Sequence, residues 1–394
     1  MYNTFCLLHL RKDYNNMVQN PFVVKGYAGN DYFCDREEET RKLVIRALGG
    51  SDSSVISPRR FGKSGLVIHA LEAIEGENSG IDTLYTDIYA TESLCDFIDN
   101  LSSAVLAKFP EKTPFGRRFW GFIKSIRPYL TFDQLTGFPQ VHLEFASQLQ
   151  KEATLKNIFD LLNGSSRNPI VIAIDEFQQI SEYPENNVEA LLRTYTQNLR
   201  NIRFIFSGSK RRLMTAMFND AKRPFYGSVE SMFLGKLDRD VYGKFISSMF
   251  EKSGREIEKD ALDLVLDWTR IHTYYTQRVC HNLFDTRTKR VTTDLVKKVC
   301  KDILEGESFN FLQMREILPV QQWRFLIGVA KEGKVSQITS STFVSKYKIG
   351  SAATARRAAE SLEDKELILK THSLDGTTYE VYDVFFSRWL EQTY

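Results

Sequence analysis

The stretch VISPRRFGKSGLVIHALEAIEG, residues 55–76, indicates the fold of this chain more specifically than any other segment. Val55 and Ile56 predict the end of a buried strand, and the apolar periodicity after Gly65 predicts a helix. The eight residues between them, SPRRFGKS, match the phosphate-loop pattern GxxxxGK[ST] except that Ser57 replaces the first glycine. The stretch therefore predicts a strand–loop–helix unit that binds phosphate.

The residue types in this loop fit phosphate chemistry. Gly62 lets backbone N–H groups wrap around phosphate oxygens, and the positive end of the following helix faces them. Lys63 reaches the β- and γ-phosphates of a nucleotide, and the Ser64 hydroxyl is placed to ligate Mg²⁺. The expected nucleotide-binding residues form one continuous run: Ser57, Pro58, Arg59, Arg60, Phe61, Gly62, Lys63, Ser64 and Gly65.

Alternatives remain open for this loop. An ordinary Gly-Lys turn, capped by the Ser64 hydroxyl, would use the same residues without binding a nucleotide. Arg59 and Arg60 either face phosphate or pair with an acidic neighbour. The strand before the loop, the helix after it and an acidic segment downstream favour the nucleotide-binding interpretation.

The acidic segment is NPIVIAIDEFQQI, residues 168–180, in which five apolar residues run into Asp175 and Glu176. A carboxylate pair at the end of a buried strand is costly unless it meets cations or water. Beside a phosphate loop, Asp175 would hold Mg²⁺ through its water shell. Glu176 would orient and deprotonate the attacking water, which predicts a hydrolase. Asp175 could also cap a helix that begins at Phe177.

A third segment, residues 201–214, predicts another apolar strand that ends in Ser207, Gly208 and Ser209. A polar side chain at the tip of the strand beside the acidic one can touch the γ-phosphate or its water. We expect Ser209 in this role, with Ser207 as the alternative and turn chemistry as a competing interpretation. Asp87, at the end of a further strand, either supports the loop arginines or caps the next element.

Short apolar runs that alternate with amphipathic stretches predict a parallel sheet buried on both faces by helices. The expected strands are residues 55–57, 83–88, 170–174 and 203–206. Residues 93–162 are mostly helical in pattern but are interrupted by prolines, and we expect them to form an insertion on this α/β core.

From Leu237 onward, helical periodicity replaces the strand pattern. After Pro319, three short helices precede two strand-like runs that meet at Asp375-Gly376, the outline of a winged helix. The expected domains are an N-terminal extension (residues 1–30), a phosphate-loop core (31–236), a helical lid (237–310) and a winged-helix domain (311–394).

Composition limits the possible functions. Among 394 residues, 52 Lys and Arg balance 50 Asp and Glu, so no global charge attracts nucleic acid or an anionic membrane. Five cysteines without a CxxC pair are too few for a disulfide framework. FCLLHL, residues 5–10, is too short for a signal peptide, and no window resembles a membrane-spanning helix. We therefore expect a cytoplasmic protein with no membrane partner.

Together these segments resemble the archaeal-type ATPases of the AAA+/STAND branch of P-loop proteins, over nearly the whole chain. PRRFGKS is similar to the family's arginine-bearing phosphate loop, and IVIAIDEFQQI is similar to its acidic strand. NPFV with DYFCDREEETRKL (31–43) resembles the family's first box, and FIFSGS with RPFYG (223–227) resembles its sensor strand and the motif that follows. HTYYTQRVCH (272–281) resembles its lid segment, and YEVYDVFFSRWL (379–390) resembles the end of its winged helix.

Three sites depart from the family pattern. Ser228 follows the PFYG motif where arginine is usual, which argues against an arginine finger at that position. The lid's usual Gly-x-Pro is replaced by Ile271-His272-Thr273, which predicts a changed nucleotide affinity or adenine selectivity. Asp35 stands in the first box where glycine is common, so this turn is expected to be strained or different.

The resemblance implies an α/β P-loop NTPase core with a five-stranded parallel sheet of the additional-strand type, then a helical lid and a C-terminal winged helix. It also implies that ATP and Mg²⁺ bind between core and lid, with Ser64 and Asp175 at the metal and with Glu176, Lys63 and Ser209 as catalytic residues. The expected activity is slow, Mg²⁺-dependent ATP hydrolysis that drives a conformational switch. A protein partner or a homo-oligomer would receive its signal.

Two alternatives belong to other functional classes. One is a nucleotide-gated regulator that binds DNA through the winged helix, and the other is a nucleotide-binding scaffold with little hydrolysis. Residues 351–370 carry four basic and four acidic side chains, and the hairpin tip has no Lys or Arg. Because phosphate neutralisation dominates DNA affinity, DNA contact through Arg356 and Arg357 is weakly supported. The sequence favours a protein-interaction or autoinhibitory role for this domain.

Overall fold

The computed structural model describes residues 20–77, 80–134, 137–165, 168–373 and 376–394. They form two compact units, of which one spans Lys25–Lys236 and the other combines Leu237–Tyr394 with the described residues up to Val24. In these residues, no helix combines the length and the apolar character that crossing a membrane requires. The N-terminal segment with FCLLHL and the tip dipeptide Leu374-Asp375 lie outside the described residues.

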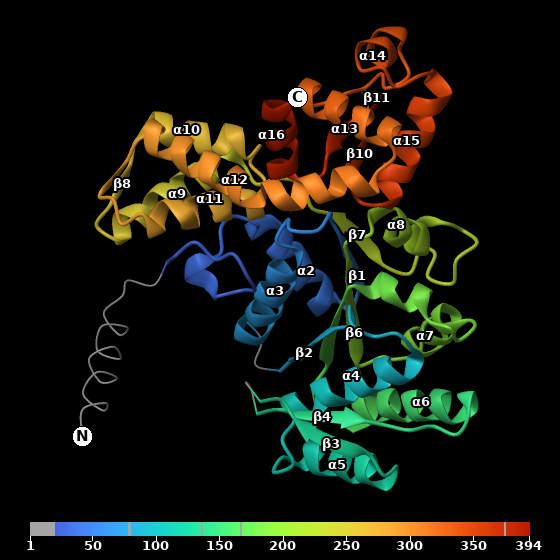
Figure 1. The fold of residues 1–394 in the computed structure, drawn as a ribbon. Coiled ribbons are helices and arrows are strands. Elements are labelled where there is room, and N and C mark those ends of the chain that lie inside the picture. Colours follow the sequence, from blue (N-terminus) through green and yellow to red (C-terminus); the bar gives the residue numbers. More distant parts are fainter. Residues whose placement is uncertain (1–19, 78–79, 135–136, 166–167, 374–375) are drawn as a thin grey trace, which may run out of the picture. The chain divides into compact units, whose positions relative to one another are not determined.

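The first unit is built on a five-stranded parallel sheet in the order β2-β5-β6-β1-β7. Figure 1 labels β1, β2, β6 and β7 of this sheet. Its strands are β1 (Ser53–Ile56), β2 (Asp82–Asp87), β5 (Ile170–Asp175), β6 (Ile202–Gly208) and β7 (Glu230–Phe233). Two strands, β5 and β6, separate β1 from β2, which is the additional-strand order that the resemblance implies. The four strands placed from the sequence are present within two residues of their predicted limits. The fifth strand that the resemblance implies is β7, for which no residue range was predicted.

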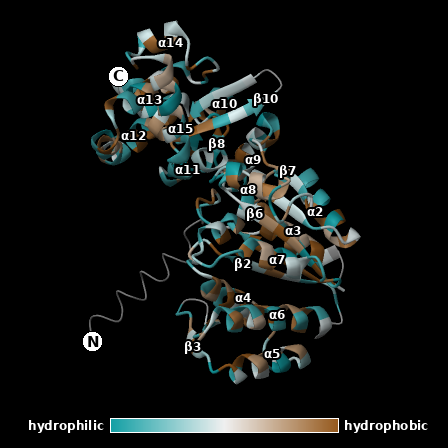
Figure 2. Cartoon of the chain, turned by 90° about the vertical axis from the view of Figure 1, so that its right-hand side faces the viewer, coloured by the Kyte–Doolittle hydropathy of each residue, from teal (hydrophilic) through white to brown (hydrophobic). Residues whose placement is uncertain are grey.

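Helices cover both faces of this sheet, because successive side chains of a strand point to opposite faces. Val55 and Ile205 pack with α2 and α3 on one face, whereas Ile56 and Phe206 face a second core with α4, α6 and α8. Figure 2 shows hydrophobic residues gathered along α3 and the strands. The helices of this unit are η1 (Asn30–Tyr32), α2 (Glu37–Gly49), α3 (Lys63–Glu77), α4 (Leu94–Lys108), α5 (Pro114–Ser125), α6 (Gln148–Ser165), η2 (Phe177–Glu182), α7 (Val188–Thr196) and α8 (Arg211–Asn219).

The predicted insertion contains α4, α5 and α6 and also a hairpin that was not expected, β3 (Tyr129–Phe132) with β4 (Pro139–His142). Two side chains of α4 hold this hairpin by its backbone. Ser103 Oγ accepts the Val141 N–H at 2.9 Å, and Asp99 Oδ1 accepts the Leu143 N–H at 3.0 Å. Burial raises the pKa of Asp99 to about 7, and the charge of Asp96 acts in the same direction.

The second unit joins a helical region to a winged helix. Its helices are α9 (Arg239–Lys252), α10 (Lys259–Trp268), α11 (Thr273–Asp285), α12 (Thr293–Ile317), α13 (Val320–Glu332), α14 (Ser341–Lys346), α15 (Ala352–Asp364) and α16 (Val384–Thr393). Its strands are β8 (Glu256–Ile257), β9 (Arg290–Val291), β10 (Ile368–Ser373) and β11 (Gly376–Val381). The predicted hairpin is the antiparallel pair β10–β11, which follows three helices. The single helix α12 runs through residue 310, the expected boundary between lid and winged helix.

Ring contacts of Phe22 and hydrogen bonds of two arginines tie the parts of this second unit together. Phe22 packs against Phe250 and Phe284, with ring centroids 4.9 and 6.1 Å apart, so the N-terminal residues belong to the helical region. Arg270 donates to Glu391 Oε1 of α16 at 2.8 Å. Arg388 of α16 donates to the carbonyl oxygens of Trp268 and Asp267 at 2.9 and 3.0 Å. The helical region therefore donates a hydrogen bond to the winged helix, and the winged helix donates hydrogen bonds back to the helical region.

The Asp99 carboxyl gives the first unit a pH-dependent stability. Its pKa is about 7 in the folded chain and about 4 in an unfolded one. Only the folded state holds the proton between these values, so the contribution of Asp99 to stability rises as the pH falls from 7 to 4. Asp99→Asn keeps the acceptor for Leu143 and avoids the buried charge. We expect it to be more stable than wild type by about 2 kcal/mol at pH 8, about half the full shift because solvent screens the group.

This gain should vanish near pH 4.5, where wild-type Asp99 is protonated. Urea unfolding followed by circular dichroism at both pH values measures the difference. Asp160→Asn, on the exposed face of α6 beside Lys156, is the matched control and should change stability little at either pH. A wild type that is equal to Asp99→Asn at pH 8 would contradict the raised pKa.

Candidate functional site

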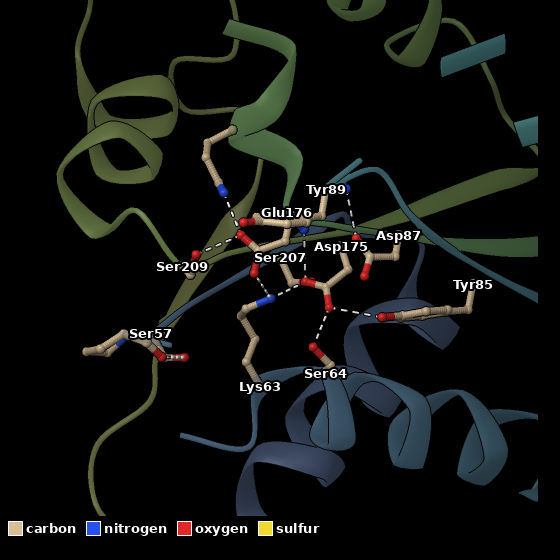
Figure 3. Close-up of polar contacts among 12 residues, drawn as sticks. Ser57, Lys63, Ser64, Tyr85, Asp87, Tyr89, Asp175, Glu176, Ser207 and Ser209 are labelled. Carbon is tan, nitrogen blue, oxygen red and sulfur yellow. Dashed lines mark hydrogen bonds and ion pairs between the residues drawn. The ribbon is translucent and has the colours of Figure 1, made fainter. Parts of the chain in front are cut away.

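The carboxyl ends of β1, β5 and β6 meet at one edge of the sheet, where the predicted loop and acidic residues converge (Figure 3). The loop follows β1, and α3 begins at Lys63. Gly62 has φ +86°, in the left-handed region that favours glycine. Its carbonyl accepts the Leu66 N–H at 2.9 Å, which starts the first helical turn. The loop geometry therefore brings Lys63 and Ser64 to the end of β5.

The Asp175 carboxylate is the centre of the site and is only 1% exposed. Its Oδ1 accepts hydrogen bonds from Lys63 Nζ, from Ser207 Oγ at 2.5 Å and from the Glu176 N–H at 2.9 Å. Lys63 is also buried, so the two opposite charges form a buried ion pair. Burial alone would raise the pKa of Asp175, but Lys63 and the serine hydroxyls outweigh it and hold that pKa below its usual value.

The second oxygen of Asp175, Oδ2, accepts hydrogen bonds from Ser64 Oγ and from Tyr85 OH, the latter at 3.0 Å. Burial raises the pKa of Tyr85, and the charge of Asp175 raises it further. Tyr85 therefore remains a hydroxyl donor at neutral pH. Lys63, Ser64, Tyr85 and Ser207 thus surround one carboxylate with donors from α3, β2 and β6.

Glu176 follows β5 in the left-handed backbone region, at φ +55° and ψ +39°. Its Oε2 accepts hydrogen bonds from Ser209 Oγ at 2.7 Å and from Gln178 Nε2 at 2.5 Å. Its Oε1 lies 3.3 Å from Lys63 Nζ. The two acidic side chains therefore share the Lys63 ammonium. The two serines at the end of β6 contact different carboxylates: Ser207 contacts Asp175, and Ser209 contacts Glu176.

Other loop residues predicted to bind nucleotide have structural contacts of their own. Ser57 is buried, and its hydroxyl donates to the Pro58 carbonyl at 3.1 Å. Arg59 lies over the Tyr89 ring, 5.5 Å from its centroid. The remaining three predicted residues are Arg60 at φ +67°, Phe61, which is buried, and Gly65, where a side chain would lie against Phe33. Their predicted roles toward nucleotide stay predictions.

Asp87 lies at the end of β2 beside the two acidic residues. Its Oδ1 accepts the Tyr89 N–H at 2.9 Å, which fits the capping alternative. Burial raises its pKa, as do the charges of Asp175 and Glu176.

Two of the departures from the family pattern also have structural contacts or backbone strain. The Ser228 hydroxyl donates to the Phe225 carbonyl at 2.7 Å and closes a turn. At a second departure, in the other unit, Ile271 has φ +56°, which is strained for a β-branched residue.

Sequence reasoning missed two residues of this site. Tyr85 precedes Asp87 by two positions and therefore shares its strand face, a signal that could have been used. Gln178 and its neighbour Gln179 are indistinguishable in the sequence, and no local pattern shows that Gln178 contacts Glu176. Only the geometry of η2 separates them.

Comparisons with known proteins agree with this architecture. A family model described as a probable winged helix domain matches residues 309–392. A Walker-type ATPase of Pyrococcus abyssi is similar at TM-score 0.65 and 18% identity, over 94% of this chain and 99% of that one. The Orc2 protein of Aeropyrum pernix, in ADPNP–ADP complexes, is similar at TM-score 0.60 and 13% identity, over 95% and 96%. A search of curated proteins finds no match.

At these identities the similarity concerns the fold. The parallel α/β core matches that of AAA+ ATPases, and a winged-helix domain follows it at the C-terminal end. The predicted fold class is confirmed.

The buried ion pair predicts a specific loss of stability. Lys63→Met leaves the Asp175 charge buried without its cation, and we expect it to lower the free energy of unfolding by about 3 kcal/mol at pH 7. In wild type the lowered pKa of Asp175 contributes stability above about pH 4 that is lost as the pH falls further. In the variant the same group takes up a proton more readily, so the loss should shrink toward pH 4.

Urea unfolding at pH 7 and pH 4 measures this difference. Lys156→Met, which removes an exposed partner of Asp160, is the matched control and should change stability little at either pH. Adding Asp175→Leu to Lys63→Met should restore part of the stability at pH 7, because no buried charge then remains. A Lys63→Met loss that is equal at both pH values would show that the ion pair is not its cause.

Proposed function

We propose that this chain is a Mg²⁺-dependent ATP hydrolase of the AAA+/STAND branch of P-loop proteins, which acts as a nucleotide-driven conformational switch. The observation that carries the proposal is the convergence of Lys63, Ser64, Asp175 and Glu176 at one sheet edge. Phosphoryl transfer to water requires a cation at a helix start, a hydroxyl, and two carboxylates with different surroundings.

The donor set fits a magnesium–phosphate group. Lys63 stands at the N-terminus of α3, where the helix dipole adds positive charge toward an anion. Ser64 Oγ and Asp175 Oδ2 are neighbouring oxygens, the ligand type that Mg²⁺ prefers, directly or through water. When bound, Mg²⁺ and ATP supply the phosphoanhydride bond and the Lewis acid that polarises it.

The proposed chemistry of the chain's own residues follows from their contacts. Glu176 accepts a proton from the attacking water, as a base within reach of the Lys63 ammonium. Lys63 balances negative charge that develops on the phosphoryl oxygens. Ser209, hydrogen-bonded to Glu176, connects the end of β6 to that base. Such a site needs no covalent intermediate, because positioning and electrostatics provide most of the acceleration.

The output of the switch is proposed to be a movement of the second unit's helices, read by a protein partner or by further copies of this chain. Arg270 and Arg388 hydrogen-bond the helical region to α16, so a shift of these helices carries the winged helix with it.

The proposed location is the cytoplasm. The described cysteines are free thiols, which supports it.

A DNA-binding regulator is the second candidate, since Arg356 and Arg357 are exposed on α15. The balancing acidic residues of this helix argue against tight binding. We expect duplex DNA at physiological salt to leave ATP turnover unchanged and to bind wild type and Arg356→Ala/Arg357→Ala equally weakly by fluorescence anisotropy. Binding that depends on these two arginines would favour the regulator.

Steady-state ATP hydrolysis with Mg²⁺, together with binding of a fluorescent ATP analogue, tests the main proposal on the full chain. Wild type should turn over slowly, and Glu176→Gln should lose at least about 100-fold in rate while still binding. Lys63→Ala should lose both. Glu182→Gln, an exposed carboxylate of η2 beside Lys210, is the control and should behave as wild type.

Two results would count against this proposal. Tight binding without turnover in wild type would favour the nucleotide-binding scaffold. The absence of both binding and turnover would remove the nucleotide from the function altogether.

A further inference from the structure

We infer that Gln178 is a positioning residue for the proposed hydrolysis. Its side-chain amide fixes the Glu176 carboxylate so that Oε1, and not Oε2, receives the proton. The inference rests on the proposed function and adds the group that orients the base. Gln178 does not reach the reacting atoms in this role, because it acts through Glu176.

The two hydrogen bonds to Glu176 are both on Oε2. Gln178 Nε2 donates at 2.5 Å and Ser209 Oγ donates at 2.7 Å. Over the described part of the chain, Oε1 meets only the Lys63 ammonium, at 3.3 Å. With Oε2 occupied by two donors, Oε1 is the oxygen left to accept a proton from water, and it lies beside the cation that attracts phosphate.

The side-chain amide of Gln178 makes a hydrogen bond with its nitrogen but leaves its oxygen unpaired among the described residues. The side chain is 2% exposed. A buried carbonyl without a donor carries a desolvation penalty that an apolar side chain of similar size avoids. The amide cannot be turned round, because its carbonyl would then face the Glu176 carboxylate. Its one hydrogen bond, to Glu176, is what explains a glutamine here.

The neighbouring strand leaves room for this amide. A Cβ at Gly208 would overlap Gln178 Oε1 and the Met214 side chain. The φ of Gly208 is not positive, so the glycine is required for space rather than for backbone conformation. The end of β6 therefore provides both the Ser209 donor to Glu176 and the space that seats the second donor.

Gln179 supplies a matched comparison on the same turn. Its Nε2 donates to the Thr91 carbonyl at 3.1 Å, and its backbone N–H donates to the Glu176 carbonyl rather than to the carboxylate. The two adjacent glutamines therefore separate a positioning role from a structural one.

The experiment measures ATP turnover with Mg²⁺, affinity for a fluorescent ATP analogue, and Tm for full-length wild type, Gln178→Met and Gln179→Met. We expect Gln178→Met to lose about 30-fold in kcat, since a misplaced base is inefficient, while nucleotide affinity changes less than about threefold. Its Tm should equal or exceed that of wild type, because an orphan carbonyl leaves the core. Gln179→Met should keep wild-type turnover and affinity.

Gly208→Ala gives an independent variant that pushes the amide aside. It should lose turnover as Gln178→Met does, and the double variant should be no slower than the slower single one, because both act through the same hydrogen bond.

The outcomes separate the two proposals. If wild type hydrolyses ATP and Gln178→Met does so as fast as Gln179→Met, the positioning role is wrong and the proposed function stands. If Gln178→Met loses affinity or Tm in step with turnover, Gln178 is structural and the inference is again wrong. If wild type binds nucleotide but shows no turnover, the hydrolase proposal fails and the inference fails with it.

Discussion

The edge of the sheet in the first unit is organised around one interaction, the buried ion pair between Lys63 and Asp175. Removing two such charges from water costs several kcal/mol per ion. The pair is tolerable because other donors satisfy the remaining lone pairs of the carboxylate: Ser64 from α3, Tyr85 from β2 and Ser207 from β6. Together with Asp175 on β5, these groups come from four separate segments of the chain. The strand order β2-β5-β6-β1 is what brings them within hydrogen-bonding distance of one carboxylate.

The parts of the fold that could be predicted are those whose signal is local. The loop after β1 and the apolar run of β5 into Asp175 carry their pattern within a dozen residues, and both were found. The strand β7 escaped because Glu230–Phe233 is a four-residue edge strand with exposed ends, without the apolar run of a buried strand. The β3–β4 hairpin escaped because it depends on α4. Asp99 and Ser103 stabilise backbone that lies about 40 residues later, which no window can show.

The same limit applies inside the site. The residue types of Lys63, Ser64, Asp175 and Glu176 are dictated by phosphate chemistry, so their spacing was informative. Tyr85 contacts Asp175 only because of the register between β2 and β5, which pairs Tyr85 with Ala173 and Asp87 with Asp175. The two-residue spacing places Tyr85 on the strand face of Asp87. The sequence does not show how the two strands align, so the contact of Tyr85 with the carboxylate itself could not be predicted.

Unfavourable local features are concentrated where β5 ends. Glu176 adopts a left-handed backbone, Gln178 buries an unpartnered carbonyl, and Asp175 holds a buried charge. Two apolar cores, one on each face of the sheet, provide the stability that offsets them. An arrangement selected for stability alone would replace these groups with apolar ones of similar size. These groups lie at the sheet edge, around a lysine at a helix start. Binding of a charged ligand explains that position better than the stability of the fold does.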